Sequence, residues 1–149
     1  MYSFINKKIM HIAIIIVLIL AIIFSVKYQI YYIIGSSMEP TIHKNSFIIV
    51  KENQQPKYGD IIVIDFGDNM EKEAKRIVGI PGDKIILSDY VYVNGVKYIN
   101  SRCDVDTCVE QEYQLNIDEY FVVGDNYLRS IDSRIFGAIK SKQILGVHN

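Results

Sequence analysis

Residues 59–66 read Gly59-Asp60-Ile61-Ile62-Val63-Ile64-Asp65-Phe66, and this stretch decides the fold class. It contains a continuous β-branched run of the length expected for a buried strand. Gly-Asp precedes the run, and the turn-forming Gly67-Asp68-Asn69 follows it. We therefore predict a buried strand here.

Further strand-like runs lie on both sides of this stretch. They cover residues 46–50, 75–80, 91–93, 96–98 and 120–123. Asn94-Gly95 separates two of these runs and is the strongest short-range signal for a β-hairpin. The sequence beyond residue 28 shows neither a long amphipathic helical pattern nor a repeat. The chain is therefore predicted to be mostly β, with a folded sheet or partial barrel after its N-terminal segment.

The N-terminal segment is apolar over residues 9–26, and only His11 and Ser25 interrupt it. As a helix, these 18 residues rise about 27 Å, close to the thickness of the hydrocarbon core of a bilayer. A cleaved secretory signal peptide is the alternative, but its apolar region usually has about 7–15 residues and ends at a small-residue cleavage site. Because this run is longer and no Ala-x-Ala follows it, we favour a retained, single transmembrane helix over residues 9–28.

Flanking charges predict the orientation of this helix in the lipid bilayer. Lys7, Lys8 and the N-terminal amine precede it and Lys27 follows it, an excess that favours a cytoplasmic N-terminus. The expected organisation is a cytoplasmic segment 1–8, a cell-membrane anchor 9–28 and an extracytoplasmic β domain 29–149. Aromatic rings collect at membrane interfaces, and three tyrosines suit the outer one: Tyr28, Tyr31 and Tyr32.

The overall charge excludes one class of partner. The first 28 residues hold three of the 16 Lys and Arg residues and none of the 17 acidic ones, so the remainder carries 13 against 17, a net charge of −4. An acidic domain of this kind argues against a nucleic-acid partner.

The two cysteines, Cys103 and Cys108, leave two interpretations open. Outside the cytoplasm they could close a small disulfide loop, and two ordinary thiols in a surface turn are an equally good interpretation. A metal site is disfavoured because no second Cys/His pair accompanies them, and His43 and His148 are distant in sequence. We predict no bound metal and no cofactor.

Ser37 begins the segment Ser37-Met38-Glu39-Pro40-Thr41, in which proline stiffens the backbone. Pro40 restricts its own φ and pushes Glu39 towards extended geometry, so the serine hydroxyl stands on a rigid support. A nucleophile benefits from such support, because small misplacements are costly in rate. Taken alone, a serine near a proline is far more often part of an ordinary turn.

A serine hydroxyl needs a base to take its proton, and Lys75 is the better candidate. His11 lies in the apolar run, His148 is next to the C-terminus, and His43 is expected at the surface. Lys75 lies on a predicted strand with Ile77, Val78 and Ile80. Burial disfavours the charged form of an amine and lowers its pKa, which would allow it to act as a general base. The alternative is an exposed edge-strand lysine paired with a nearby acid.

Four segments, in this order, resemble bacterial type I signal peptidases (serine peptidase family S26) in a short, Gram-positive-like form. They are residues 35–41, which closely follow the apolar run, 58–63, 75–83 and 124–137. Ser-Met-x-Pro-Thr, Lys-Arg-x-x-Gly-x-Pro-Gly-Asp and Gly-Asp-Asn-x-x-x-Ser-x-Asp-Ser-Arg are highly specific as a set, and the resemblance covers residues 7–137. The eukaryotic-type branch has histidine at the position of Lys75, so the chain resembles the bacterial or organellar branch.

The resemblance implies a membrane-bound serine endopeptidase that removes signal peptides from exported preproteins after small residues of the Ala-x-Ala type. Ser37 would be the acylating nucleophile, Lys75 its general base, and Ser130 the residue that orients the lysine amine. Asp132 and Arg134 resemble a structural ion pair; without the resemblance they would be a solvated charge pair.

Met38 is expected to pack on the apolar surface near the membrane, and a core methionine is the alternative. Two features depart from the family pattern. Some relatives have a serine two positions before the nucleophile, where this chain has Gly35. The second oxyanion donor would then be a backbone N–H, a water or absent, with modest turnover. Only the 35 residues 84–118 separate the last two segments, so an inserted β-ribbon would be small.

Three alternative functions differ from this one in location, substrate range or activity. A self-cleaving repressor uses Ser-Lys chemistry in the cytoplasm, which the apolar run and the acidic domain disfavour. A dedicated peptidase for pilins or a few surface proteins would keep the chemistry and narrow the substrate range. A non-catalytic accessory of the same fold is disfavoured by the intact Ser37, Lys75 and Ser130. We expect a monomer.

Overall fold

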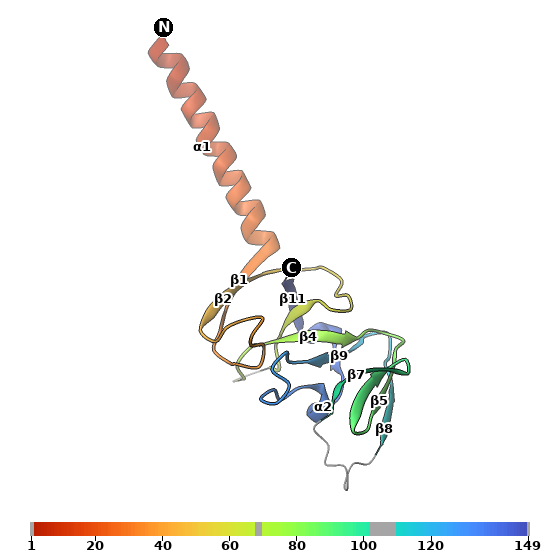
Figure 1. Cartoon of the computed structure of the whole chain (residues 1–149). Helices are drawn as coiled ribbons and strands as arrows, with labels where there is room; N and C mark the ends of the chain where they lie inside the picture. Colours follow the sequence, from red (N-terminus) through yellow and green to blue (C-terminus); the bar gives the residue numbers. More distant parts are fainter. Residues whose placement is uncertain (1, 68–69, 102–109, 149) are drawn as a thin grey trace.

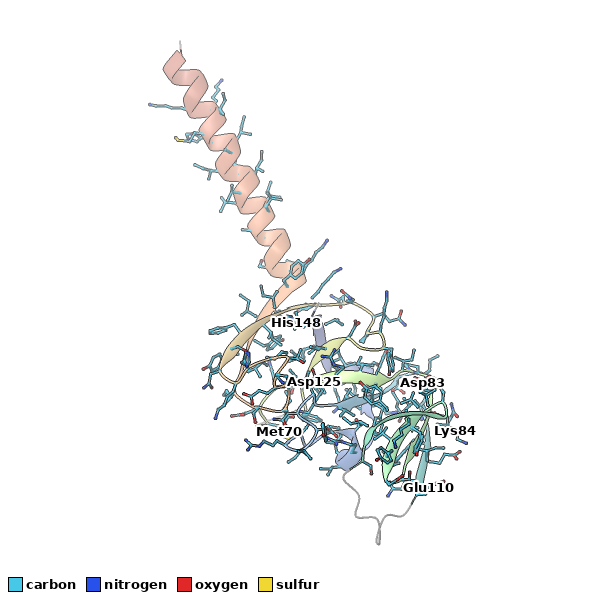
Figure 2. The ribbon with its side chains drawn as sticks, in the orientation of Figure 1. Met70, Asp83, Lys84, Glu110, Asp125 and His148 are labelled. Carbon is cyan, nitrogen blue, oxygen red and sulfur yellow. The ribbon has the colours of Figure 1, made fainter. Side chains whose placement is uncertain are left out.

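The computed structural model describes residues 2–67, 70–101 and 110–148, which form a long helix followed by two β-sheets (Figure 1). Helix α1 (Tyr2–Lys27) projects away from the sheets, and the side chains that Figure 2 draws on it point outwards. Its segment Lys7–Lys27 is long and apolar enough to cross a membrane, and its most apolar part is not buried against the rest of the chain. The helix is therefore not the core helix of the β domain.

The larger sheet has seven strands in the described part of the chain, each antiparallel to its neighbours. In spatial order they are β1 (Tyr28–Ile33), β2 (Ser46–Lys51), β11 (Ile144–His148), β3 (Ile61–Ile64), β4 (Glu73–Gly79), β9 (Glu119–Val123) and β10 (Ile139–Lys140). The stretch predicted as a buried strand is β3, and all four of its residues are buried. This sheet and the helix confirm the mostly β prediction.

Strand β3 separates two hydrophobic cores. Successive side chains on a strand point to opposite faces. Ile61 and Val63 accordingly pack in one core with Ile33, Met38 and Val50. Residues of β3 on the other face pack in a second core, with members such as Ile62, Ile64, Ile77, Val122 and Ile139. Because both faces are covered, the strand consists of apolar residues throughout.

The smaller sheet is built from the region between the last two sequence motifs. Its strands, in spatial order, are β7 (Val96–Asn100), β6 (Tyr90–Val93), β5 (Lys84–Leu87) and β8 (Gln111–Gln114). Asn94 and Gly95 connect β6 to β7 with φ angles of 50° and 80°, which confirms the predicted hairpin. A third core, which includes Val78, Ile85 and Phe121, contains residues of both sheets.

Several short strands of the structure were not predicted from the sequence. Strand β1 directly follows the apolar helix, and its run Tyr-Gln-Ile-Tyr-Tyr-Ile continues the aromatic and apolar composition, so no boundary is visible in the sequence. Strand β11 contains Gly146 and an irregular register, yet it lies between β2 and β3. Its place is set by pairing with residues far away in the chain. Cys103 and Cys108 lie outside the described residues, so both interpretations of them stay open.

Candidate active site

Ser37 lies in the loop between β1 and β2, where backbone contacts hold it on two sides. The next residue, Met38, is fully buried in the core beneath the loop. Met38 is therefore a core methionine, the alternative to the expected position on the apolar surface near the membrane, because its side chain packs in the core with residues of β1 and β2. On the other side, the Asn126 N–H donates to the Ser37 carbonyl at 2.8 Å, and Asn126 Nδ2 donates to the Ser36 carbonyl at 3.1 Å. The hydroxyl of Ser37 thus stands on a fixed backbone.

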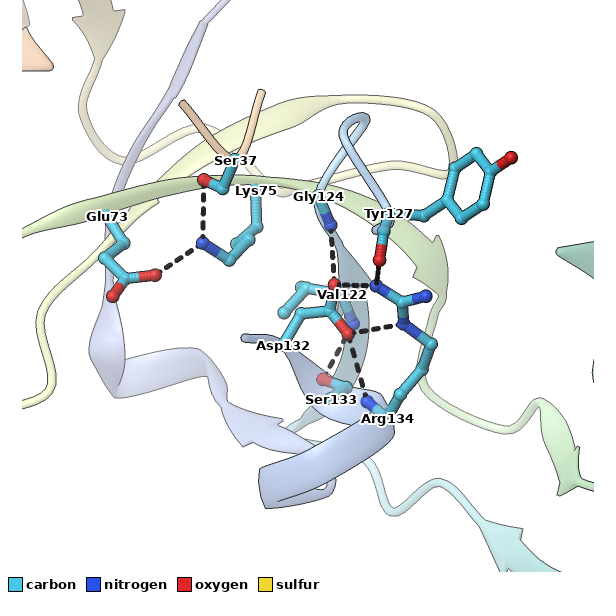
Figure 3. A network of polar contacts seen from close by, with 9 residues as sticks. All are labelled: Ser37, Glu73, Lys75, Val122, Gly124, Tyr127, Asp132, Ser133 and Arg134. Carbon is cyan, nitrogen blue, oxygen red and sulfur yellow. Dashed lines mark hydrogen bonds and ion pairs between the residues drawn. The ribbon is translucent and has the colours of Figure 1, made fainter. Parts of the chain in front are cut away.

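Lys75 lies on β4, which has β3 and β9 as neighbours, and its side chain is 1 % exposed. Its Nζ is 3.1 Å from Ser37 Oγ, so two residues 38 positions apart in the chain share a hydrogen bond (Figure 3). The residue opposite Lys75 on β3 is the apolar Ile62. The alternative predicted an exposed lysine on an edge strand, paired with a nearby acid. The exposure and the edge position are wrong, whereas a nearby acid, Glu73, does pair with the amine. The structure brings Ser37 and Lys75, both singled out from the sequence, into contact.

The amine of Lys75 has a second partner, the carboxylate of Glu73 (Figure 3). Side chains two apart on a strand share a face, which explains this contact. Glu73 was not among the predicted site residues. The strand predicted from the sequence began at Lys75, whereas β4 begins at Glu73, so the shared face of the two side chains became visible only in the structure.

Asp132 and Arg134 form a buried ion pair under the site. Arg134 donates from Nε to Asp132 Oδ1 at 2.8 Å and from a terminal nitrogen to Oδ2 at 2.7 Å, and the two side chains are 1 % and 0 % exposed. Asp132 also caps the short helix α2 (Ser133–Phe136) and accepts a hydrogen bond from the Gly124 N–H at 3.0 Å. Arg134 further donates to the Tyr127 carbonyl (Figure 3). The pair thus connects Gly124, Tyr127 and the start of α2.

The pKa values of two carboxylates near the site, the buried Asp132 and the partly buried Asp125, are lowered from their ordinary values. Burial raises the pKa of Asp132, but hydrogen bonds from Arg134, Gly124 and Ser130 stabilise its charged form more, so the pKa is lowered. Burial also raises the pKa of Asp125, and hydrogen bonds from Arg76 and Thr41 outweigh that effect in the same way. These acids are therefore structural anions and poor proton donors.

Ser130 is fully buried close to Ser37, and one of its contacts is the hydrogen bond to Asp132. The described hydrogen bonds of the lysine amine go to Ser37 and Glu73. The role predicted for Ser130, orientation of Lys75, stays a prediction.

The segment Gly124-Asp125-Asn126 connects the loop that carries Ser37 to the strands. A Cβ on Gly124 would lie 2.3 Å from Ser130 Oγ and 2.5 Å from the Ser37 carbonyl oxygen, so only glycine fits. Asp125 accepts two hydrogen bonds from Arg76, at 2.8 and 2.6 Å, and Arg76 also donates to the Gly59 carbonyl. The sequence motifs contained Arg76, Gly124, Asp125 and Asn126, but their partners became visible only in the structure.

A cleft of about 410 Å³ opens beside Ser37 and Lys75. One wall is formed by the end of β1 and the loop that carries Ser37, residues 31–37, and the other by residues 71–75 on and before β4. Arg129 and Ile131 complete the lining. Gly35 lies on the same wall as Ser37, and a Cβ added there would meet no atom within 4 Å. This position is open space, without a side-chain hydroxyl.

Residues 6–149 match the family described as signal peptidase, peptidase S26. The chain belongs to this family. It is 36 % identical to a signal peptidase I of Bacillus amyloliquefaciens over 90 % of this chain and 81 % of that protein. It is 32 % identical to a signal peptidase I of Bacillus licheniformis over 90 % of this chain and 82 % of the other.

Among solved structures, a signal peptidase I from Enterococcus faecalis V583 is 29 % identical over 63 % of this chain and 97 % of that one, with a TM-score of 0.47. Membership of the signal peptidase family makes the chain a serine peptidase. In this chain, a buried amine in contact with a serine hydroxyl lies beside the cleft.

The Gly124→Ala substitution is expected to lower kcat of the peptidase by about 10²-fold, because the added methyl must displace the Ser37 backbone or Ser130. Gly79→Ala is a matched control, since its methyl would meet side chains of the core between the sheets, at 2.8–3.0 Å. The control should lose about 1–3 kcal/mol of stability and keep most of its kcat. Measurement of kcat and thermal unfolding on both variants checks this. Equal kcat losses would contradict the role given to Gly124.

The Asp132→Asn substitution is expected to lower the free energy of unfolding by roughly 3–5 kcal/mol near neutral pH, because it leaves the buried Arg134 without its counter-charge. The folded-state pKa of Asp132 is depressed, so its contribution is complete above the unfolded pKa of about 4 and decreases as the pH falls below it. Denaturant titrations at several pH values measure the difference between variant and parent. That difference should shrink below about pH 4; a constant difference down to the lowest pH would refute this assignment.

Proposed function

We propose that the chain is a membrane-bound serine endopeptidase that removes N-terminal signal peptides from exported preproteins, with Ser37 as nucleophile and Lys75 as general base. The observation that carries the proposal is the 3.1 Å contact between the buried Lys75 amine and the Ser37 hydroxyl at the edge of the cleft. Signal peptidase I proteins that are similar to the chain over most of its length support the substrate class.

The geometry supports a definite sequence of proton transfers. The neutral amine of Lys75 accepts the Ser37 proton as Oγ attacks the scissile carbonyl carbon. The oxyanion of the tetrahedral intermediate is stabilised by donors that include the Ser37 backbone N–H. The lysine ammonium then protonates the leaving amine, and an acyl ester remains on Ser37. In the second half of the reaction, Lys75 takes a proton from water, the hydroxide attacks the ester, and Ser37 regains its proton.

The positions of the histidines favour lysine as the base. His43 lies in the loop after the nucleophile and is exposed. His11 lies within α1, and the ring of His148 contacts the Ile49 carbonyl at 2.8 Å on a distant part of the sheet. A Ser-His arrangement would require a histidine at the hydroxyl of Ser37, where the structure has Lys75 and Glu73 beside it.

The cleft fits an extended peptide with small side chains near the cleaved bond. Its two walls include the end of β1, residues 31–33, and the start of β4, residues 73–75, so a peptide placed between them can form backbone hydrogen bonds. Shallow pockets reject large side chains by steric exclusion, which supports cleavage after Ala-x-Ala. The open space beside Gly35 leaves the second oxyanion donor to a backbone N–H or a water.

We infer that α1 anchors the enzyme in the lipid bilayer with residues 1–8 in the cytoplasm, 9–28 in the membrane and 29–149 outside. The uncovered apolar surface of α1 and the lysines on either side of it support this arrangement. Strand β1 follows α1 without an intervening loop, so the nucleophile stands ten residues beyond the end of the helix. Substrates that leave the membrane would therefore meet the cleft close to its surface.

The Ser37→Ala and Lys75→Ala variants are expected to lose cleavage of a precursor with an Ala-x-Ala site by about 10³-fold or more, because each removes one member of a unit that acts together. His43→Ala is the control and should stay active, since its side chain is exposed. The assay uses the purified full chain in detergent, with product identified by mass spectrometry. Full activity without the Lys75 amine would overturn the base assignment, and dependence on His43 would indicate a histidine base instead.

Protease added to the outside of protoplasts is expected to digest residues beyond about 30 and to leave an N-terminal tag protected. The reason is the excess of basic residues before α1, which favours a cytoplasmic N-terminus. Immunoblotting of the tag and of a C-terminal epitope measures both ends. Digestion of the β domain only in inverted vesicles would reverse the orientation.

A further inference from the structure

Glu73 is an acid in direct contact with the Lys75 amine, and the two side chains differ in their exposure. The lysine side chain is 1 % exposed and that of Glu73 is 39 % exposed. The amine is therefore fixed inside the protein, whereas the carboxylate borders the cleft and has access to water. Glu73 thus places a carboxylate charge directly against the lysine nitrogen.

The other charged groups around the site face different partners. On β4, Arg76 points to the opposite face and binds Asp125. In the loop region, Asp132 and Arg134 form an ion pair with each other, and both side chains are buried. Glu71, Lys72 and Arg129 line the same cleft, and Lys72 Nζ lies 5.3 Å from the centre of the Tyr31 ring.

The neighbours of Lys75 on β3 and along its own face, Ile62 and Ile77, are apolar. Among the described contacts of the amine, the charged partner is Glu73.

We propose that Glu73 is a positioning residue that stabilises the ammonium form of Lys75 and so sets the lowest pH at which the enzyme works. This inference rests on the proposed function of Ser37 and Lys75. The carboxylate acts at two stages with opposite effects. Before the reaction it opposes loss of the lysine proton, which narrows the pH range of the active form. During proton transfer from Ser37 it stabilises the positive charge that develops on the amine, which speeds the chemical step.

The two effects predict pH–rate profiles that cross. Glu73→Gln removes the charge and keeps the shape of the side chain, so the acid limb of kcat/KM should move to lower pH by about one unit. If about half of the positive charge has developed on the amine in the transition state, the plateau at high pH should fall about threefold and the rate on the acid limb should rise about threefold. A residue that only held the fold would lower the rate at every pH and leave the limb in place.

The experiment compares the full chain with Glu73→Gln, Glu73→Asp and Glu112→Gln in detergent, using kcat/KM of a precursor peptide from about pH 5 to pH 11, because kcat/KM reports groups of the free enzyme. Glu73→Asp keeps the charge but moves it away from the amine by one methylene. The acid limb of its kcat/KM profile should therefore lie between those of the parent and Glu73→Gln. Glu112 is exposed and pairs with Lys84 in the smaller sheet, so Glu112→Gln has the same charge change far from the site and should match the parent.

A second readout does not depend on catalysis. The rate of reductive methylation of Lys75, followed by peptide mass spectrometry, reports the pH at which the amine becomes neutral, and Glu73→Gln should shift it to lower pH by the same amount. If the acid limb of kcat/KM and the pH profile of methylation in Glu73→Gln both match those of the parent, the proposed role of Glu73 is overturned. Absence of Ser37-dependent cleavage in the parent would instead refute the proposed function, and the methylation profile would still decide whether Glu73 controls the amine.

Discussion

The structure depends on the burial of one amine. Lys75 lies on β4 within a sheet whose β3 strand is apolar throughout, and its side chain is almost completely shielded from water. An amine in such a place is costly unless it is neutral or partnered. Its two contacts, the Ser37 hydroxyl and the Glu73 carboxylate, satisfy the amine and also determine its chemistry. In the proposed mechanism, the hydroxyl is the group that the amine activates, and the carboxylate is the positioning residue beside that amine.

A second constraint fixes the hydroxyl. Ser37 lies in a loop, and a loop alone would not hold it within hydrogen-bonding distance of Lys75. Asn126 binds the loop through its backbone and its side chain, Met38 anchors it in the core, and Gly124 lets the turn approach closely enough for these contacts. Beneath them, the buried Asp132–Arg134 pair holds the turn in place. The proposed nucleophile is thus placed by residues that do not take part in the reaction.

The arrangement of the two sheets places the site within a small domain. The larger sheet places the strand of Lys75 and the turn after β9 next to each other, and the smaller sheet packs against it through a shared core. Helix α1 contributes no cover to either sheet and connects to β1 directly. In the proposed function, the membrane and the cleft are therefore linked by a single strand, which keeps the nucleophile close to the surface of the bilayer.

The sequence by itself determined the mostly β fold, the apolar N-terminal helix, the Asn94-Gly95 hairpin and the family, because strand runs, turn residues and contiguous motifs are local patterns. It also singled out Ser37 and Lys75. Only the tertiary structure brought Asn126 to the Ser37 carbonyl, Asp125 to Arg76 and β11 between β2 and β3, since those contacts join residues far apart in the chain. Burial, too, was decided there: Met38 and the Asp132–Arg134 pair have sequence surroundings that suit the surface, and packing of other segments over them encloses them. Glu73 lies just before the strand predicted over residues 75–80, so only the structure, in which β4 begins at Glu73, showed its contact with the Lys75 amine.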